Sequence, residues 1–101
     1  MIKHIVIWKF KHFDNENAKK ETIEKLKTLF NALPSKISEI KKLDLSTNSE
    51  KAPIDNFDMV LTIDFESMED MYAYKIHPEH IKVAEYLKSV RESRAAIDYE
   101  Y

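Results

Sequence analysis

Apolar residues alternate with polar ones at the start of the chain and then recur at helical spacing. One side of residues 2–10 carries Ile2, His4, Val6, Trp8 and Phe10. This period of two, together with the β-branched and aromatic residues, predicts a strand. From Asp14 or Asn15 to about Leu33 the apolar residues lie three or four apart, which predicts an amphipathic helix ended by Pro34. A weaker strand is expected from Ile37 to about Thr47.

The second half of the chain contains two helix starts and two further strands. Residues 57–65 alternate clearly and predict a strand. Ser67 and Asp70 resemble a capping box that opens a short helix. Pro78 ends this helix at about Ile76 and starts another that runs to about Val90, because proline lacks an N–H and has a fixed φ. The apolar tail is expected to be an ordered final strand, with one face formed by Ala95, Ile97, Tyr99 and Tyr101.

The order of elements is β-α-β-β-α-β, which predicts one α+β domain of the ferredoxin-like type over residues 1–101. Helices then cover one face of the sheet only. The other face carries Ile5, Ile7 and Val60, and a chain of this size has no spare element to cover it. A second copy is the simplest cover, so we expect a homodimeric α/β barrel. The final strand is expected beside the strand of residues 37–47.

Composition excludes several classes of function. The net charge of −2 and interleaved charges give no support for a nucleic-acid partner. With no cysteine there are no disulfides, thiolate catalysis or Cys-zinc sites, and a reducing cytoplasmic location is expected. With no glycine there is no Gly-rich phosphate loop and no Gly-x-Ser-x-Gly nucleophile elbow. No signal peptide is visible, and no apolar run approaches the ~20 residues needed to span a membrane.

The junction between the two predicted helices holds the strongest candidate chemistry. Tyr74, His77 and His80 lie within seven residues of each other around Pro78. His80 can act as a general base and Tyr74 as a hydrogen-bond donor to a developing oxyanion. The simpler interpretation of His77 is an N-cap residue. The simpler interpretation of His4 is a core histidine whose hydrogen-bonding groups are satisfied within the protein. His77 and His80 also have usable metal-ligand spacing, but no third ligand is obvious. We therefore expect neither a metal nor another cofactor.

The chain resembles the stress-responsive dimeric α/β-barrel (Dabb) family. The matching stretches are residues 1–6, residues 57–67, the Tyr74-x-x-His77-Pro78-x-His80 element and the closing residues 97–99. The resemblance implies a pocket between helices and sheet. In a plant polyketide cyclase of the family, the catalytic residues match His80 and Tyr74 and another pocket histidine matches His4. This chain has Met59 and Leu26 where that enzyme has a histidine and a tyrosine.

These observations give three hypotheses. The first is a dimer that binds an apolar small molecule through His4, Trp8, Leu26, Met59 and His77. If catalytic, it would carry out polyketide-cyclase-like, lyase or isomerase chemistry with His80 as base and Tyr74 as donor. The second is a non-catalytic stress-response dimer without a ligand pocket. The third is an enzyme of the antibiotic-monooxygenase type. A cavity that touches both Tyr74 and His80 would favour the first.

Overall fold

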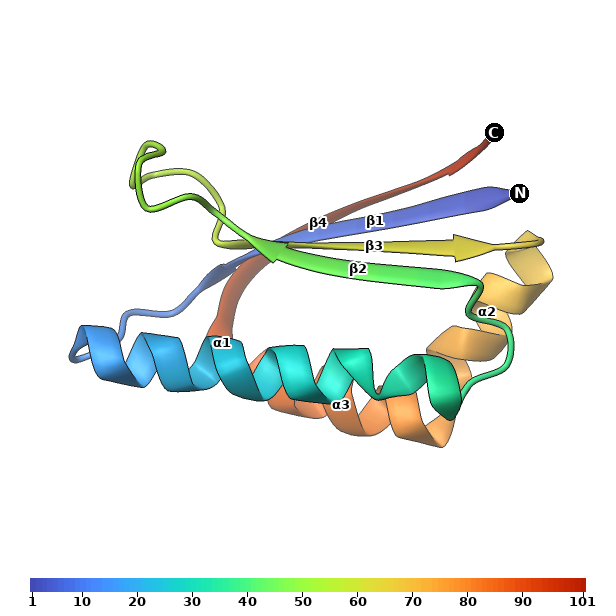
Figure 1. Ribbon diagram of the computed structural model, residues 1–101, viewed down its shortest axis with the longest axis horizontal. Helices are drawn as coiled ribbons and strands as arrows, with labels where there is room; N and C mark the ends of the chain where they lie inside the picture. Colours follow the sequence, from blue (N-terminus) through green and yellow to red (C-terminus); the bar gives the residue numbers. More distant parts are fainter.

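A four-stranded antiparallel sheet and three α-helices make up the computed structural model, which describes residues 1–101 (Figure 1). The strands are β1 (Ile2–Phe10), β2 (Lys42–Thr47), β3 (Met59–Phe65) and β4 (Arg91–Glu100). The α-helices are α1 (Glu16–Asn31), α2 (Met68–Ile76) and α3 (Pro78–Val90). This is the expected β-α-β-β-α-β order, with the second helical segment divided at Pro78, so the ferredoxin-like prediction is confirmed.

The capping residues begin the helices where the sequence indicated. The side-chain oxygen of Asn15 accepts a hydrogen bond from the backbone N–H of Ala18 (2.8 Å) and starts α1. Ser67 accepts one from Asp70 N–H (3.2 Å) and starts α2. Both caps satisfy N–H groups that the first turn leaves unpaired. The tail is also ordered as predicted, because it pairs with β1 along its length.

The predicted sheet order was wrong. The observed order is β2-β3-β1-β4, so β4 and β2 lie at opposite edges. The reason is the pairing of β1, which has β3 on one side and β4 on the other, both antiparallel. Ile5 lies opposite Ile97 in the β4 pairing, which brings together two apolar residues of the face that the helices leave uncovered.

The predicted start of β2 was also wrong. Ile37 and Ile40 are buried, but they precede the strand, which begins at Lys42. Pro34 lies within a short 3-10 helix (Leu33–Ser35) that follows α1, and the turn after it places the two isoleucines in the core. As buried core residues they give the sequence an apolar pattern like that of a strand, although they precede the strand that pairs. Similarly, Phe57 is outside β3 and is 37% exposed.

All three helices lie on one side of the sheet (Figure 1). The side chains of β1 that point to the helices are almost fully buried, whereas Ile5 and Ile7 on the other face are only half-buried. On that outer face of β4, Ile97 is 59% and Tyr99 42% exposed. The single chain therefore leaves an apolar sheet face partly in contact with water.

Candidate functional site

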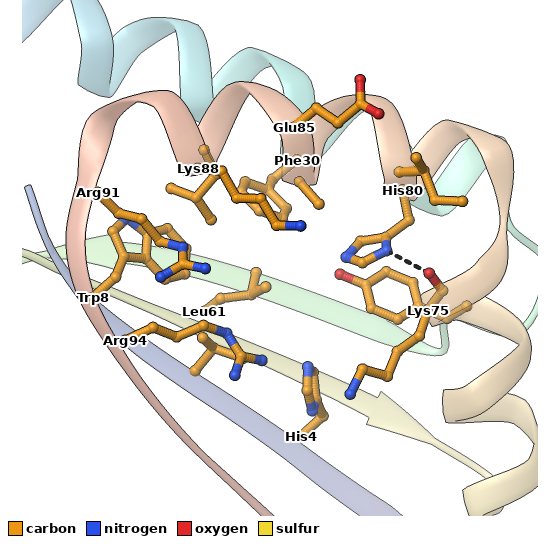
Figure 2. A pocket seen from close by; sticks show the side chains of 15 residues that line it. His4, Trp8, Phe30, Leu61, Lys75, His80, Glu85, Lys88, Arg91 and Arg94 are labelled. Carbon is orange, nitrogen blue, oxygen red and sulfur yellow. Dashed lines mark hydrogen bonds between the residues drawn. The ribbon is translucent and has the colours of Figure 1, made fainter.

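A cavity of about 420 Å³ lies between α3, the end of α2 and the sheet (Figure 2). Its lining contains Tyr74 and His80, as well as His4 and Trp8 from β1. Most of the remaining apolar lining comes from Val6, Phe30, Leu61, Ile81, Ala84 and Leu87. The volume is within the range of small-molecule sites, which are about 300–1,000 Å³.

The α2–α3 junction brings Tyr74 and His80 together. Tyr74 is in the last turn of α2 and His80 in the first turn of α3. Between them, His77 adopts an extended conformation (φ −65°, ψ 133°) and Pro78 begins α3, so the chain changes direction. The centroids of the Tyr74 and His80 rings are 4.3 Å apart. This convergence is the arrangement predicted from the Pro78 break.

Tyr74 has a buried hydroxyl group without a partner. The residue is 1% exposed, and its hydroxyl oxygen has no hydrogen bond within the chain. Burial raises the pKa of the Tyr74 phenol well above 10, so the group stays protonated and can only donate or accept as a neutral hydroxyl. A buried donor without an acceptor costs free energy, and a ligand oxygen in the cavity would supply the missing acceptor.

His80 is held in one tautomer by the backbone. Its Nδ1 lies 3.0 Å from the carbonyl oxygen of Lys75, which can only accept, so Nδ1 carries the proton and donates it (Figure 2). In the neutral ring Nε2 then carries the lone pair. Burial lowers the pKa of His80, and this effect outweighs the opposing effect of the Lys75 hydrogen bond. The imidazole is therefore mostly neutral at pH 7 and has a free basic nitrogen.

His4 forms a third polar group in the cavity, and Asp98 orients it. Nδ1 of His4 donates to the Asp98 carboxylate, which lies directly opposite on β4. The centroid of the His4 ring is 6.1 Å from that of Tyr74. Burial lowers the pKa of His4 despite the favourable contact with Asp98. Sequence reasoning had not assigned a role to Asp98, because the pairing joins residues 94 positions apart.

The other predicted ligand-binding residues are placed differently. Trp8 lines the cavity, is fully buried, and its indole N–H has no hydrogen-bond partner. Leu26 and Met59 are buried in the core and are not among the lining residues. His77 is the N-cap of α3, where Nδ1 accepts from Glu79 N–H (3.1 Å), and it does not line the cavity either. We therefore leave these three residues out of the candidate site.

Four basic side chains at the cavity were also missed from the sequence: Lys75, Lys88, Arg91 and Arg94. Glu85 is the one acidic residue among the lining side chains. The signal that could have found them is composition, because the chain has 16 basic residues but Arg91 and Arg94 are its only arginines. No three His, Asp or Glu side chains are close enough together to hold a metal ion. None of the helices has the length and apolar character needed to cross a membrane.

The element order and the sheet define a ferredoxin-like α+β domain with a cavity between its layers. The chain matches the stress responsive A/B barrel domain over residues 2–101 and belongs to this family. It is 30% identical to a stress-response A/B barrel domain-containing protein of Arabidopsis thaliana, covering 98% of this chain but only 46% of that protein. It is 26% identical to olivetolic acid cyclase of Cannabis sativa, covering 97% of this chain and 94% of the cyclase.

Among solved structures, a dimeric protein of unknown function from Bacteroides fragilis has the same ferredoxin-like fold. Its TM-score is 0.89 at 33% identity, and the match covers 99% of this chain and 95% of that one. This similarity to a dimeric protein supports a homodimer.

Proposed function

We propose that this protein is a homodimer that binds a small carbonyl compound between its helices and sheet and catalyses proton transfer without a cofactor. The observation that carries the proposal is the cavity in which the unpartnered Tyr74 hydroxyl and the tautomerically fixed His80 converge. The second hypothesis, a dimer whose interior is filled by its own side chains, is not supported by a cavity of about 420 Å³.

The proposed step is removal of a proton from a carbon next to the carbonyl group. Nε2 of His80 accepts the proton, and the electron pair of the C–H bond moves into the new carbon–carbon double bond of an enolate. The carbonyl oxygen gains the negative charge, and the Tyr74 hydroxyl donates a hydrogen bond to it. Tyr74 is suited to this because its raised pKa keeps the proton on the phenol. Return of the proton from His80 to a different carbon of the enolate system would complete an isomerisation.

The environment favours this chemistry in two ways. The apolar lining from Trp8, Phe30 and Leu61 limits competition from water, which strengthens hydrogen bonds to the enolate oxygen. The lowered pKa of His80 leaves the imidazole neutral at pH 7, so it is available as a base without prior deprotonation. Similarity to olivetolic acid cyclase supports the same class of reaction for this chain, with the substrate still to be found.

The test measures hydrogen–deuterium exchange at an acidic carbon. Benzoylacetone, a neutral aromatic 1,3-diketone, is incubated with the protein in D₂O, and loss of its central CH₂ signal is followed by NMR. We expect the protein to accelerate exchange, and we expect His80→Ala to lower that rate at least about 100-fold, as is usual for loss of a general base. Tyr74→Phe should also lower it, because the enolate oxygen loses its donor.

The matched control is His12→Ala, because His12 is exposed and does not line this cavity. It should exchange benzoylacetone at the rate of the unmodified protein. If His80→Ala and His12→Ala are equally active, or if the unmodified protein gives only the buffer rate, the proposed catalysis is wrong.

A further inference from the structure

The charges around the cavity are strongly unbalanced. Four cationic side chains line it, from Lys75, Lys88, Arg91 and Arg94, against the single carboxylate of Glu85. The protein as a whole has a net charge of −2, so this local excess of positive charge is opposite in sign to the rest of the surface. Figure 2 shows the head groups of these cations turned toward the space between α3 and the sheet.

None of the four cations is neutralised within the chain. Seven other lysines form ion pairs with Asp or Glu side chains: Lys3, Lys19, Lys27, Lys36, Lys41, Lys42 and Lys82. No such pair includes Lys75, Lys88, Arg91 or Arg94, although Glu85 lies on the same cavity wall. The basic residues that surround the cavity are therefore free to bind an anion that enters it.

An irregularity in the sheet brings Arg91 to the same cavity wall as Arg94. Arg94 lies opposite Trp8, and its side chain is on the helix side of β4. In a regular strand a residue three positions away would point to the opposite face. The β1–β4 register shifts between Lys9 and Phe10, so Arg91 lies opposite Phe10 and also reaches the cavity. The bulge thus places both guanidinium groups in the lining of the cavity.

Arginine is the residue best matched to a carboxylate. Its planar guanidinium donates two parallel hydrogen bonds to the two oxygens, whereas a lysine acts as a point charge. We propose that the cavity binds carboxylic acids in preference to their neutral analogues, with the carboxylate bound by Arg91 and Arg94 and an apolar body packed against Trp8, Phe30 and Leu61. This inference rests on the proposed function in one respect, since it takes the same cavity to be a small-molecule site.

The layout of the cavity indicates how such an acid would lie. Figure 2 shows Arg91 and Arg94 beside Trp8, on the side of the cavity away from His80. A carboxylate held by the arginines therefore leaves the far end of the ligand at the Tyr74 hydroxyl, which lacks an acceptor. The best fit is a keto acid with an aromatic or alkyl portion, whose carbonyl oxygen accepts from Tyr74 while its carboxylate pairs with the arginines.

Isothermal titration calorimetry with a matched pair of probes tests this inference. The probes are 3-benzoylpropionate, a keto acid, and its primary amide, which has almost the same shape without the charge. We expect the acid to bind at least about tenfold more tightly, as is typical for charge-assisted hydrogen bonds. Raising the salt concentration should weaken binding of the acid and leave the amide unchanged, because the arginines are accessible to solvent.

Substitutions then locate the anion site. Arg94→Gln should lower the affinity for the acid toward that of the amide, and Arg94→Lys should lie between Arg94→Gln and the unmodified protein. Lys82→Gln is the control, because Lys82 is on α3 but does not line the cavity. Equal binding of acid and amide, absence of acid binding up to millimolar concentration, or an acid preference that survives in the Arg91→Gln/Arg94→Gln variant would overturn the proposal. So would displacement of the acid by inorganic phosphate at similar concentration, which would indicate a site for any anion.

The two proposals fail separately. Exchange of benzoylacetone that depends on His80, without a preference for the acid, would retain proton transfer and reject the carboxylate site. A preference for the acid that depends on Arg94, without exchange, would retain the carboxylate site and reject catalysis. The salt dependence of the unmodified protein needs no variant, so the test stands even if one substitution impairs folding.

Discussion

Replacing Tyr74 by phenylalanine should stabilise the protein while lowering its activity. The ring of Tyr74 packs in the core, with centroids 5.2 Å from Phe65 and 4.3 Å from His80, and phenylalanine keeps these contacts. The hydroxyl is buried without a partner in the free protein. Leaving such a group unsatisfied costs about 1–3 kcal/mol. We therefore expect Tyr74→Phe to raise the free energy of unfolding by about 1 kcal/mol, or Tm by about 4–8 °C for a domain of this size.

Chemical and thermal unfolding measure this change at a fixed protein concentration, because the stability of a dimer depends on concentration. Tyr72→Phe is the control on the same helix. Tyr72 is 57% exposed, so its hydroxyl is accessible to water and its loss should change stability by less than about 0.5 kcal/mol. A loss of 1 kcal/mol or more in Tyr74→Phe would show that the hydroxyl has a partner in the free protein, and the reasoning from an unpaired donor would then be refuted.

Two further predictions concern assembly and pH. Ile7→Asp should split or unfold the dimer, because it places a charge in the apolar sheet face. Light scattering of the unmodified protein should give twice the chain mass of 12.0 kDa. A measured mass of 12.0 kDa for the unmodified protein would contradict the proposed assembly. The free energy of unfolding should fall as pH drops below 6.5, because burial lowers the pKa of His4 and His80 in the folded state and the unfolded chain then binds more protons. A His4→Gln/His80→Gln variant should flatten this dependence, and a stability that rises on acidification through this range would show that the His4–Asp98 ion pair dominates instead.

Local sequence signals were sufficient for the helices and for the junction that builds the site. Asn15 and Ser67 begin helices through their side chains, and Pro78 sets both the end of α2 and the start of α3. These effects involve neighbours in sequence, so they can be predicted without tertiary information. The convergence of Tyr74 and His80 followed from them, because the two residues flank the same break.

Features that depend on distant pairing could not be predicted in the same way. Ile37 and Ile40 have the spacing of strand residues, but burial alone does not decide whether a segment pairs. The position of β4 depends on which strand it pairs with, and the tail pattern contains no information about that choice. Asp98 was missed for the same reason, since its contact with His4 exists only after β1 and β4 have paired in this register.

The bulge between β1 and β4 explains why the basic wall of the cavity was harder to foresee than its histidines. A period-two reading of residues 91–100 assigns Arg91 and Arg94 to opposite faces, and only the register shift at Phe10 brings both to the helix side. Arg91 is also the residue that ends α3, so the bulge and the helix end are set at the same point in the chain. A change that regularised this pairing would turn one guanidinium away from the cavity. The fold would remain, but the paired arginines that distinguish an acid from its amide would be lost.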